Sequence, residues 1–171
     1  MISVAEGHFS RGEKMLARAA SGSDSPLFNY LQAARAAHLH GRDDRRDEWL
    51  RLAYQDTPEA ANAVLLTQAE FQLDRGQNEQ ALATLRRLDE NSKDHAHALS
   101  LLGRLYFDLE DWDSLADLLP RLKKTTQIKP ETLDTWAIRV RREALNRATD
   151  AEAVEAAWKG ISRAHKSDVT L

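Results

Sequence analysis

The stretch that decides the fold is ANAVLLTQAEFQLDRGQNEQALATLRRLDENSKDHAHALSL, residues 61–101. It opens with a run of helix-forming residues that reaches Gly76, and a second run of the same kind continues to Asp89. Two such runs joined by a short glycine turn predict an antiparallel helical hairpin. The same punctuation returns along the chain about every 34 residues, which predicts an array of hairpins.

Five columns of residues carry this period. The turn column holds Gly7, Gly41, Gly76 and Glu110, and five residues later stand Gly12, Arg46, Ala81 and Leu115. Two further columns are apolar throughout and hold Leu16, Leu50, Leu85 and Leu119, then Ala19, Ala53, Leu88 and Leu122. A column of small residues on the first helices holds Ala34, Ala69, Gly103 and Ala137. We expect the apolar columns to fill the core and the small residues to let paired helices approach closely.

The columns divide the chain into segments. We expect the second helix of an incomplete repeat over about residues 1–23, hairpins over 24–57, 58–93 and 94–128, a divergent hairpin over 129–166, and the start of another helix over 167–171. Within DTPE, Thr57 is expected to cap a helix that has Pro58 at its first position. An array that opens and closes in mid-repeat is expected to be a piece of a longer one.

Composition agrees with an all-α chain. It has only 7 glycines and 4 prolines among 171 residues and is rich in strong helix formers. The absence of cysteine excludes disulfides, thiolate metal sites and a cysteine nucleophile. No apolar run reaches the roughly 20 residues that cross a bilayer. Because one hairpin cannot bury its apolar surface alone, neighbouring hairpins are expected to stack into a single solenoid domain.

Charge is spread without a strong bias. The net charge is −3, with about −7 over residues 1–120 and +4 over the remainder. Paired arginines such as Arg45–Arg46 are short and interrupted by acids, which argues against nucleic-acid binding. Acidic pairs such as Asp43–Asp44 lie at turns, where helix capping explains them without catalysis.

The columns resemble tetratricopeptide (TPR) repeats. The residues that fall on the TPR positions are Leu99, Leu102, Gly103, Tyr106, Leu115, Leu119 and Leu122. This resemblance implies a right-handed α-solenoid of antiparallel helix pairs, and a fold of this kind says little about function. The lysine and asparagine pattern by which some TPR domains clamp a terminal carboxylate is missing here.

A narrower resemblance is carried by EGHFSRGEKMLARAA (residues 6–20), SPLFNYLQAARAAHLHGRDDRRDEWL (25–50), WDSLADLLPRLKK (112–124) and the pair Trp158–Lys159. These stretches are similar to the HemY family, TPR-containing inner-membrane proteins of proteobacteria associated with late protoheme biosynthesis. The resemblance implies a bacterial inner-membrane protein anchored by N-terminal membrane helices. It leaves open which side of the membrane carries this soluble fragment, and of the two sides we favour the cytoplasmic face. It also implies protein partners, among them haem-biosynthetic enzymes.

The concave wall of a TPR solenoid is lined by its first helices, and this position predicts the partner-binding residues. They are Phe28, Leu31, Arg35, His38, Leu66, Glu70, His97, Ser100, Arg104, Phe107, Asp134 and Arg141. Their mixture of apolar, aromatic and arginine side chains suits a peptide or helix of a partner protein. The alternative interpretation is a solvated face that meets further repeats.

Six histidines raise the question of a metal or haem. His38 and His40 are two residues apart, as are His95 and His97, so each pair would lie on opposite faces of a helix. We therefore expect no metal site and no cofactor, with haem binding at His38 or His97 as an alternative. Trp49, Trp112, Trp136 and Trp158 are expected to pack between hairpins.

No catalytic residue is predicted, because the chain has no P-loop, G-x-S-x-G, H-E-x-x-H or Cys-x-x-Cys motif. The sequence therefore favours a non-catalytic scaffold for protein–protein interaction. A haem or porphyrin carrier and a purely structural oligomerisation array are the alternatives.

Overall fold

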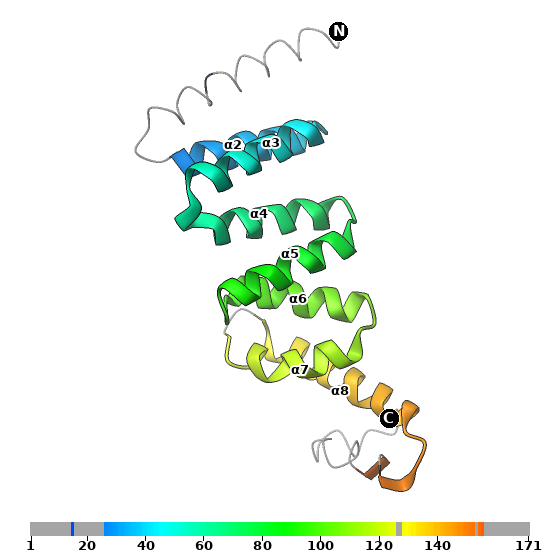
Figure 1. Ribbon diagram of the computed structural model, residues 1–171. Helices are drawn as coiled ribbons and strands as arrows, with labels where there is room; N and C mark the ends of the chain where they lie inside the picture. The colour runs from blue at the N-terminus through cyan, green and yellow to red at the C-terminus, as the bar shows by residue number, and fades with distance from the viewer. Residues whose placement is uncertain (1–14, 16–25, 126–127, 153, 156–171) are drawn as a thin grey trace. The chain divides into compact units, whose positions relative to one another are not determined.

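The computed structural model describes Met15 and residues 26–125, 128–152, 154 and 155, and within these ranges the ordered elements are all helical (Figure 1). Seven α-helices and one 3-10 helix can be delimited within the described ranges. They are α2 (Pro26–Leu39), α3 (Asp43–Asp56), η1 (Pro58–Ala60), α4 (Ala61–Asp74), α5 (Asn78–Asn91), α6 (Ala96–Asp108), α7 (Trp112–Leu122) and α8 (Pro130–Arg147). The all-α prediction is confirmed for this part of the chain.

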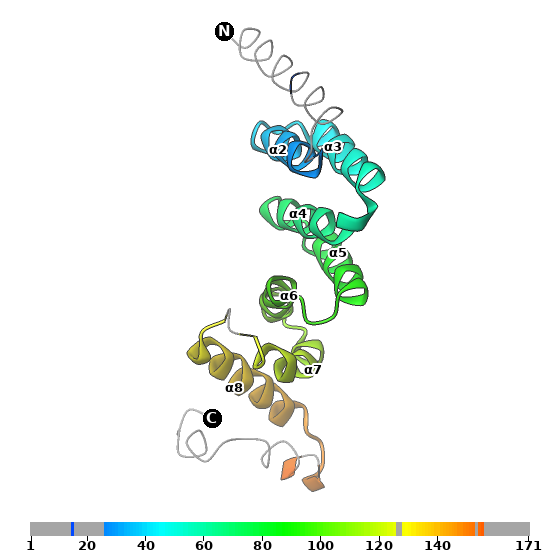
Figure 2. The same cartoon turned by 90° about the vertical axis from the view of Figure 1, so that its left-hand side faces the viewer.

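The helices belong to two compact units, an N-terminal unit with α2 to α5 and a C-terminal unit with α6 to α8. In the N-terminal unit, α2 pairs with α3 and α4 pairs with α5. The first helices α2 and α4 contact each other on one side of this unit, with α3 and α5 on the other (Figure 2). A core cluster of this unit consists of Tyr30, Ala33, Ala34, Ala37, Trp49, Leu50, Ala53, Val64 and Phe71.

Arg75 ties the two hairpins of the N-terminal unit together. It follows α4, and its guanidinium donates to the His38 carbonyl oxygen at 2.9 Å and to Asp43 Oδ1 at 3.1 Å. One arginine thereby binds the end of α2 and the start of α3, and it is a second donor to a carbonyl that also accepts the Gly41 amide.

In the C-terminal unit, α6 pairs with α7, and α8 packs against α7. Gly103 of α6 lies at a close approach: a Cβ at this position would be 2.7 Å from the Trp136 ring of α8 and 2.9 Å from Leu122 Cδ1 of α7. Only a residue without a side chain fits there, because contacts below 3 Å are repulsive.

The periodic columns coincide with the interior. In the described part of the chain both apolar columns are buried, with Leu85, Ala53, Leu88 and Leu122 at 0% exposure. The small-residue column is buried as well, at Ala34, Ala69, Gly103 and Ala137. These burial predictions are confirmed, as is the interior position of Trp49, Trp112 and Trp136.

Each of the three hairpin turns ends its first helix in the same way. Gly41 and Gly76 both have φ of +68°, and Glu110 takes their place at +56°. At each turn the amide of this residue donates to the carbonyl three residues back, and the next amide donates to the carbonyl five residues back. This is the Schellman arrangement, which needs a left-handed residue and therefore favours glycine.

One capping prediction is wrong in detail. The Thr57 hydroxyl donates to the Ala53 carbonyl at 2.6 Å and makes no capping bond to the following helix. Thr57 therefore closes α3, while Pro58 does occupy the start of η1.

Several expectations lie outside the described residues. These are the columns at Gly7, Gly12, Leu16 and Ala19, the helix expected within about 1–23 apart from Met15, most of the second half of the divergent hairpin, the helix start over 167–171, and Trp158 with Lys159.

Candidate partner-binding surface

The most exposed part of the predicted surface is one face of α2. Phe28, Leu31, Arg35 and Leu39 follow one another at spacings of three or four residues, which places them along one side of the helix. Phe28 is 61% exposed and Leu39 is 74% exposed, while Arg35 is exposed and Leu31 is half-buried against the core. We call these four residues the α2 stripe.

Leu39 was not among the predicted residues. It is the last residue of α2 and lies eleven positions after Phe28, which is close to three full helical turns. Extending the helical period by one more turn along α2 would have found it.

His38 departs from the prediction because it is an interior residue. The residue is 7% exposed, and its ring stacks on Phe71 of α4 with 4.4 Å between ring centroids. Its Nδ1 lies 3.5 Å from Arg46 Nη1 and its Nε2 lies 3.5 Å from Asp74 Oδ2. Both edges of the ring therefore face charged groups, and its face is covered by an aromatic ring.

On α4 the predicted residues are Leu66 and Glu70, both half-buried. They are four residues apart and thus lie on one face. The helix α4 contacts α2 on one side of the unit, and these two residues add one apolar and one charged side chain to the predicted set.

In the C-terminal unit the predicted residues have unequal accessibility. Arg104 is exposed and lies 3.8 Å from Asp108, whereas Phe107 is half-buried with its ring centroid 5.6 Å from Trp112 and 5.9 Å from Trp136. Phe107 therefore helps to join α6, α7 and α8, which removes part of its ring from any partner.

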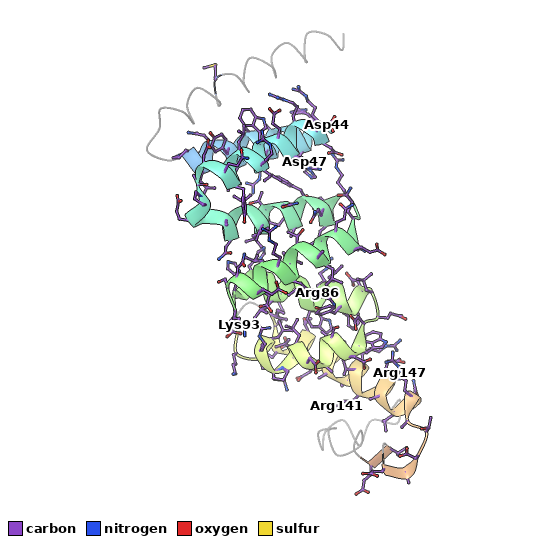
Figure 3. The ribbon with its side chains drawn as sticks, viewed as in Figure 1. Asp44, Asp47, Arg86, Lys93, Arg141 and Arg147 are labelled. Carbon is purple, nitrogen blue, oxygen red and sulfur yellow. The ribbon has the colours of Figure 1, made fainter. Side chains whose placement is uncertain are left out.

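The other predicted residues of this unit also differ in exposure. Asp134 of α8 is exposed, while His97, Ser100 and Arg141 are half-buried. The Ser100 hydroxyl donates to the Ala96 carbonyl at 2.8 Å within α6. Figure 3 marks Arg141 together with Arg147 on α8, and Arg147 pairs with Asp113 at 3.3 Å.

Several polar side chains have structural uses. The His95 ring accepts a hydrogen bond from the Ala98 amide at 3.3 Å and so caps α6. Tyr30 donates to Asp56, and this hydrogen bond, with burial and the carboxylate charge, raises the pKa of Tyr30. Within the described ranges no three metal-ligating side chains lie close enough to hold an ion.

Among the described residues, no helix combines the length and the apolarity that a bilayer span requires.

Comparisons of the chain with a family model and with curated proteins point to the same family. Residues 1–41 match the family model for the HemY protein N-terminus. The HemY proteins of Escherichia coli K12, E. coli O157:H7 and Shigella flexneri are each 31% identical to the chain over 124 residues, which is 72% of the chain. The chain spans 31% of the length of these curated relatives, and no solved structure matches it.

The family model overlaps two of the stretches on which the HemY resemblance rests, residues 6–20 and 25–50. The chain belongs to the HemY family.

Proposed function

We propose that the chain is a non-catalytic scaffold for protein–protein interaction, built as a right-handed TPR-like solenoid in a membrane-anchored protein linked to haem biosynthesis. Its partners are proteins, among them haem-biosynthetic enzymes, and they bind along the first helices. In this proposal the protein lies at the bacterial inner membrane with the repeats on the cytoplasmic side. Membership in the HemY family supports the link to haem biosynthesis and to the membrane.

The observation that carries the proposal is the α2 stripe. A phenylalanine at 61% exposure and a leucine at 74% exposure are held on one rigid helix beside the exposed Arg35. Covering such apolar area contributes about 25 cal/mol per Å², and an adjacent arginine adds directional hydrogen bonds. Aromatic and arginine side chains are also the residue types that dominate binding energy at protein interfaces.

The structural uses of the polar groups support a non-catalytic role. His95 caps a helix, and Arg46 is buried between His38, Asp43 and Asp47. The ion pairs of Arg46 measure 2.9 Å to Asp43 and 2.7 Å to Asp47, so this buried cation is balanced by acids of its own helix. These contacts hold helices in place.

The His38 geometry argues for a scaffold over a haem carrier. An axial haem ligand needs an imidazole nitrogen that faces open space, whereas the His38 nitrogens face Arg46 and Asp74. A haem titration that follows the Soret band tests this choice. The scaffold predicts no shifted band that depends on His38 or His97, and a shifted band abolished by His38→Ala or His97→Ala would favour the carrier.

Affinity capture of the full-length, membrane-inserted protein tests the scaffold. The double variant Phe28→Ala/Arg35→Glu removes an aromatic contact and reverses a charge on the α2 stripe without touching the core. We expect it to retain less than a fifth of the proteins captured by the wild type, with an unchanged helical circular dichroism spectrum. Arg86→Glu, an exposed arginine of α5 marked in Figure 3, is the matched control and should capture normally.

The proposal would be contradicted if the wild type, the Phe28→Ala/Arg35→Glu variant and the Arg86→Glu variant captured the same proteins in equal amounts. Capture of further copies of the same protein alone would instead favour the oligomerisation array.

A further inference from the structure

A cavity of about 300 Å³ lies between α3, α4 and α5 of the N-terminal unit, away from the α2 stripe. Its floor is formed by Leu50, Val64 and Leu65, which are 6%, 2% and 3% exposed. The volume is at the lower end of the range for ligand sites, so it admits a few side chains of a bound molecule.

Two arginines stand at this cavity, Arg51 of α3 and Arg87 of α5. Arg51 donates to the Gln55 side-chain oxygen at 2.7 Å. Arg87 donates to the Tyr54 hydroxyl at 3.0 Å and lies 5.6 Å from the centre of the Tyr54 ring. These contacts hold both guanidinium groups in place with neutral partners.

The charges of the two arginines are therefore unbalanced. In the part of the chain that the structure describes, neither guanidinium contacts a carboxylate. The cavity is also lined by Asp47, but Asp47 is already paired with Arg46 at 2.7 Å. A carboxylate placed between Arg51 and Arg87 would gain charge-assisted hydrogen bonds at little entropic cost, because the donors are already ordered.

Tyr54 adds an apolar contact surface. It is 38% exposed at the cavity, where its ring is fixed by Arg87. A tyrosine beside two arginines and above buried aliphatic side chains is the composition of an interface anchor point.

We propose that this cavity is a second docking site, which binds a short segment of a partner protein that carries an acidic side chain next to an apolar one. The apolar side chain contacts Leu50, Val64 and Leu65, and the carboxylate lies between Arg51 and Arg87. The site is independent of the α2 stripe, so its test does not depend on the scaffold proposal.

The test is an NMR titration of the whole isotope-labelled 171-residue chain. The probe is a capped pentapeptide of alternating leucine and glutamate, and its control has glutamine in place of glutamate. We expect the glutamate peptide to bind about threefold to tenfold more tightly than the glutamine peptide, as one or two solvent-exposed charge contacts imply. The amide shifts should lie in residues 50–55, 64–68 and around Arg87.

Arg51→Gln and Arg87→Gln should each remove most of this preference and keep the helical circular dichroism spectrum. Arg86→Gln is the matched control, because Arg86 is an exposed arginine of the same helix that does not line the cavity. Raising the salt concentration should weaken the glutamate peptide more than the glutamine peptide.

The proposal would be overturned if the glutamate peptide did not bind saturably, or if it bound with the same affinity as the glutamine peptide. It would also be overturned by amide shifts confined to other helices, or by an Arg86→Gln effect as large as that of Arg87→Gln. An additional titration with inorganic phosphate separates a general anion site from a peptide site. Phosphate binding at Arg51 and Arg87 without any peptide binding would also count against it.

Discussion

Gly103 allows three helices to meet closely in the C-terminal unit. We predict that Gly103→Ala destabilises the chain by about 1–3 kcal/mol, the usual cost of overpacking a well-filled core. Alanine improves helix propensity by about 1 kcal/mol, but a new Cβ at 2.7 Å from the Trp136 ring outweighs this gain, because that ring is stacked on Phe107 and cannot easily move. Urea denaturation followed by circular dichroism measures the change.

Measuring Gly103→Ala in a second chain, which carries Trp136→Phe, tests whether the contact with the Trp136 ring causes the destabilisation. In a Trp136→Phe chain the ring atoms nearest Gly103 are gone, so the cost of Gly103→Ala should fall. The same cost in both backgrounds, or a more stable Gly103→Ala chain, would show that the contact is not the cause.

Tyr30 links α2 to the end of α3 through its hydrogen bond to Asp56. Because this bond raises the pKa of Tyr30, the folded chain ionises the phenol at higher pH than the unfolded chain does. Its contribution is therefore complete below the unfolded pKa of about 10 and is lost as pH rises through the raised value. At neutral pH, Tyr30→Phe should cost about 1 kcal/mol.

Urea denaturation of the wild type and of Tyr30→Phe, at neutral and at alkaline pH, measures this contribution of Tyr30 to stability. The stability advantage of the wild type over Tyr30→Phe should shrink above about pH 10, the ordinary tyrosine pKa. An advantage that stays constant or grows there would rule out the assigned sign.

At the scale of the helical hairpin, the three turns share one hydrogen-bond pattern but not one residue. Glu110 adopts φ of +56° where the other hairpins use glycine. A left-handed conformation costs a residue with a Cβ roughly 1 kcal/mol. We predict that Glu110→Gly stabilises the chain by about 0.5–1 kcal/mol in thermal or urea denaturation.

Gly76→Ala is the reverse experiment. A Cβ at Gly76 would meet nothing within 4 Å, so only backbone strain acts there. This variant should lose about 1 kcal/mol. If Glu110→Gly destabilises while Gly76→Ala has no effect, backbone strain does not control these turns.

The hairpins could be predicted from the sequence because their determinants are local. Glycines at the turn positions and leucines at a fixed spacing specify helix ends and core faces without knowledge of the neighbours. Leu85 and Leu88 were predicted in the core for this reason, and both have 0% exposure.

The surroundings of His38 and the hydrogen bond of Thr57 differ from the prediction because they are determined by contacts between elements. His38 was predicted on the surface from its place in the repeat, but Phe71 and Asp74 of the next hairpin cover it. Thr57 bonds back to Ala53 because the chain turns there before η1 begins. The cavity at Arg51 and Arg87 requires three helices from two hairpins, so no local pattern could indicate it.

At the scale of the whole molecule, the chain corresponds to 31% of the length of its HemY relatives. The described residues contribute two helical units, and the N-terminal unit carries the α2 stripe and the cavity between α3, α4 and α5, both exposed among these residues. A protein of this architecture binds through exposed side chains on rigid helices, and its specificity depends on which residue types occupy them.

The measurement that tests the scaffold most directly is site-specific photo-crosslinking in the full-length, membrane-inserted protein. A photoreactive phenylalanine analogue replaces either Phe28 on the α2 stripe or Arg86 on α5. The scaffold predicts crosslinks to other proteins from position 28 and few or none from position 86. Crosslinks of equal yield from both positions, or only lipid and water adducts from position 28, would contradict it.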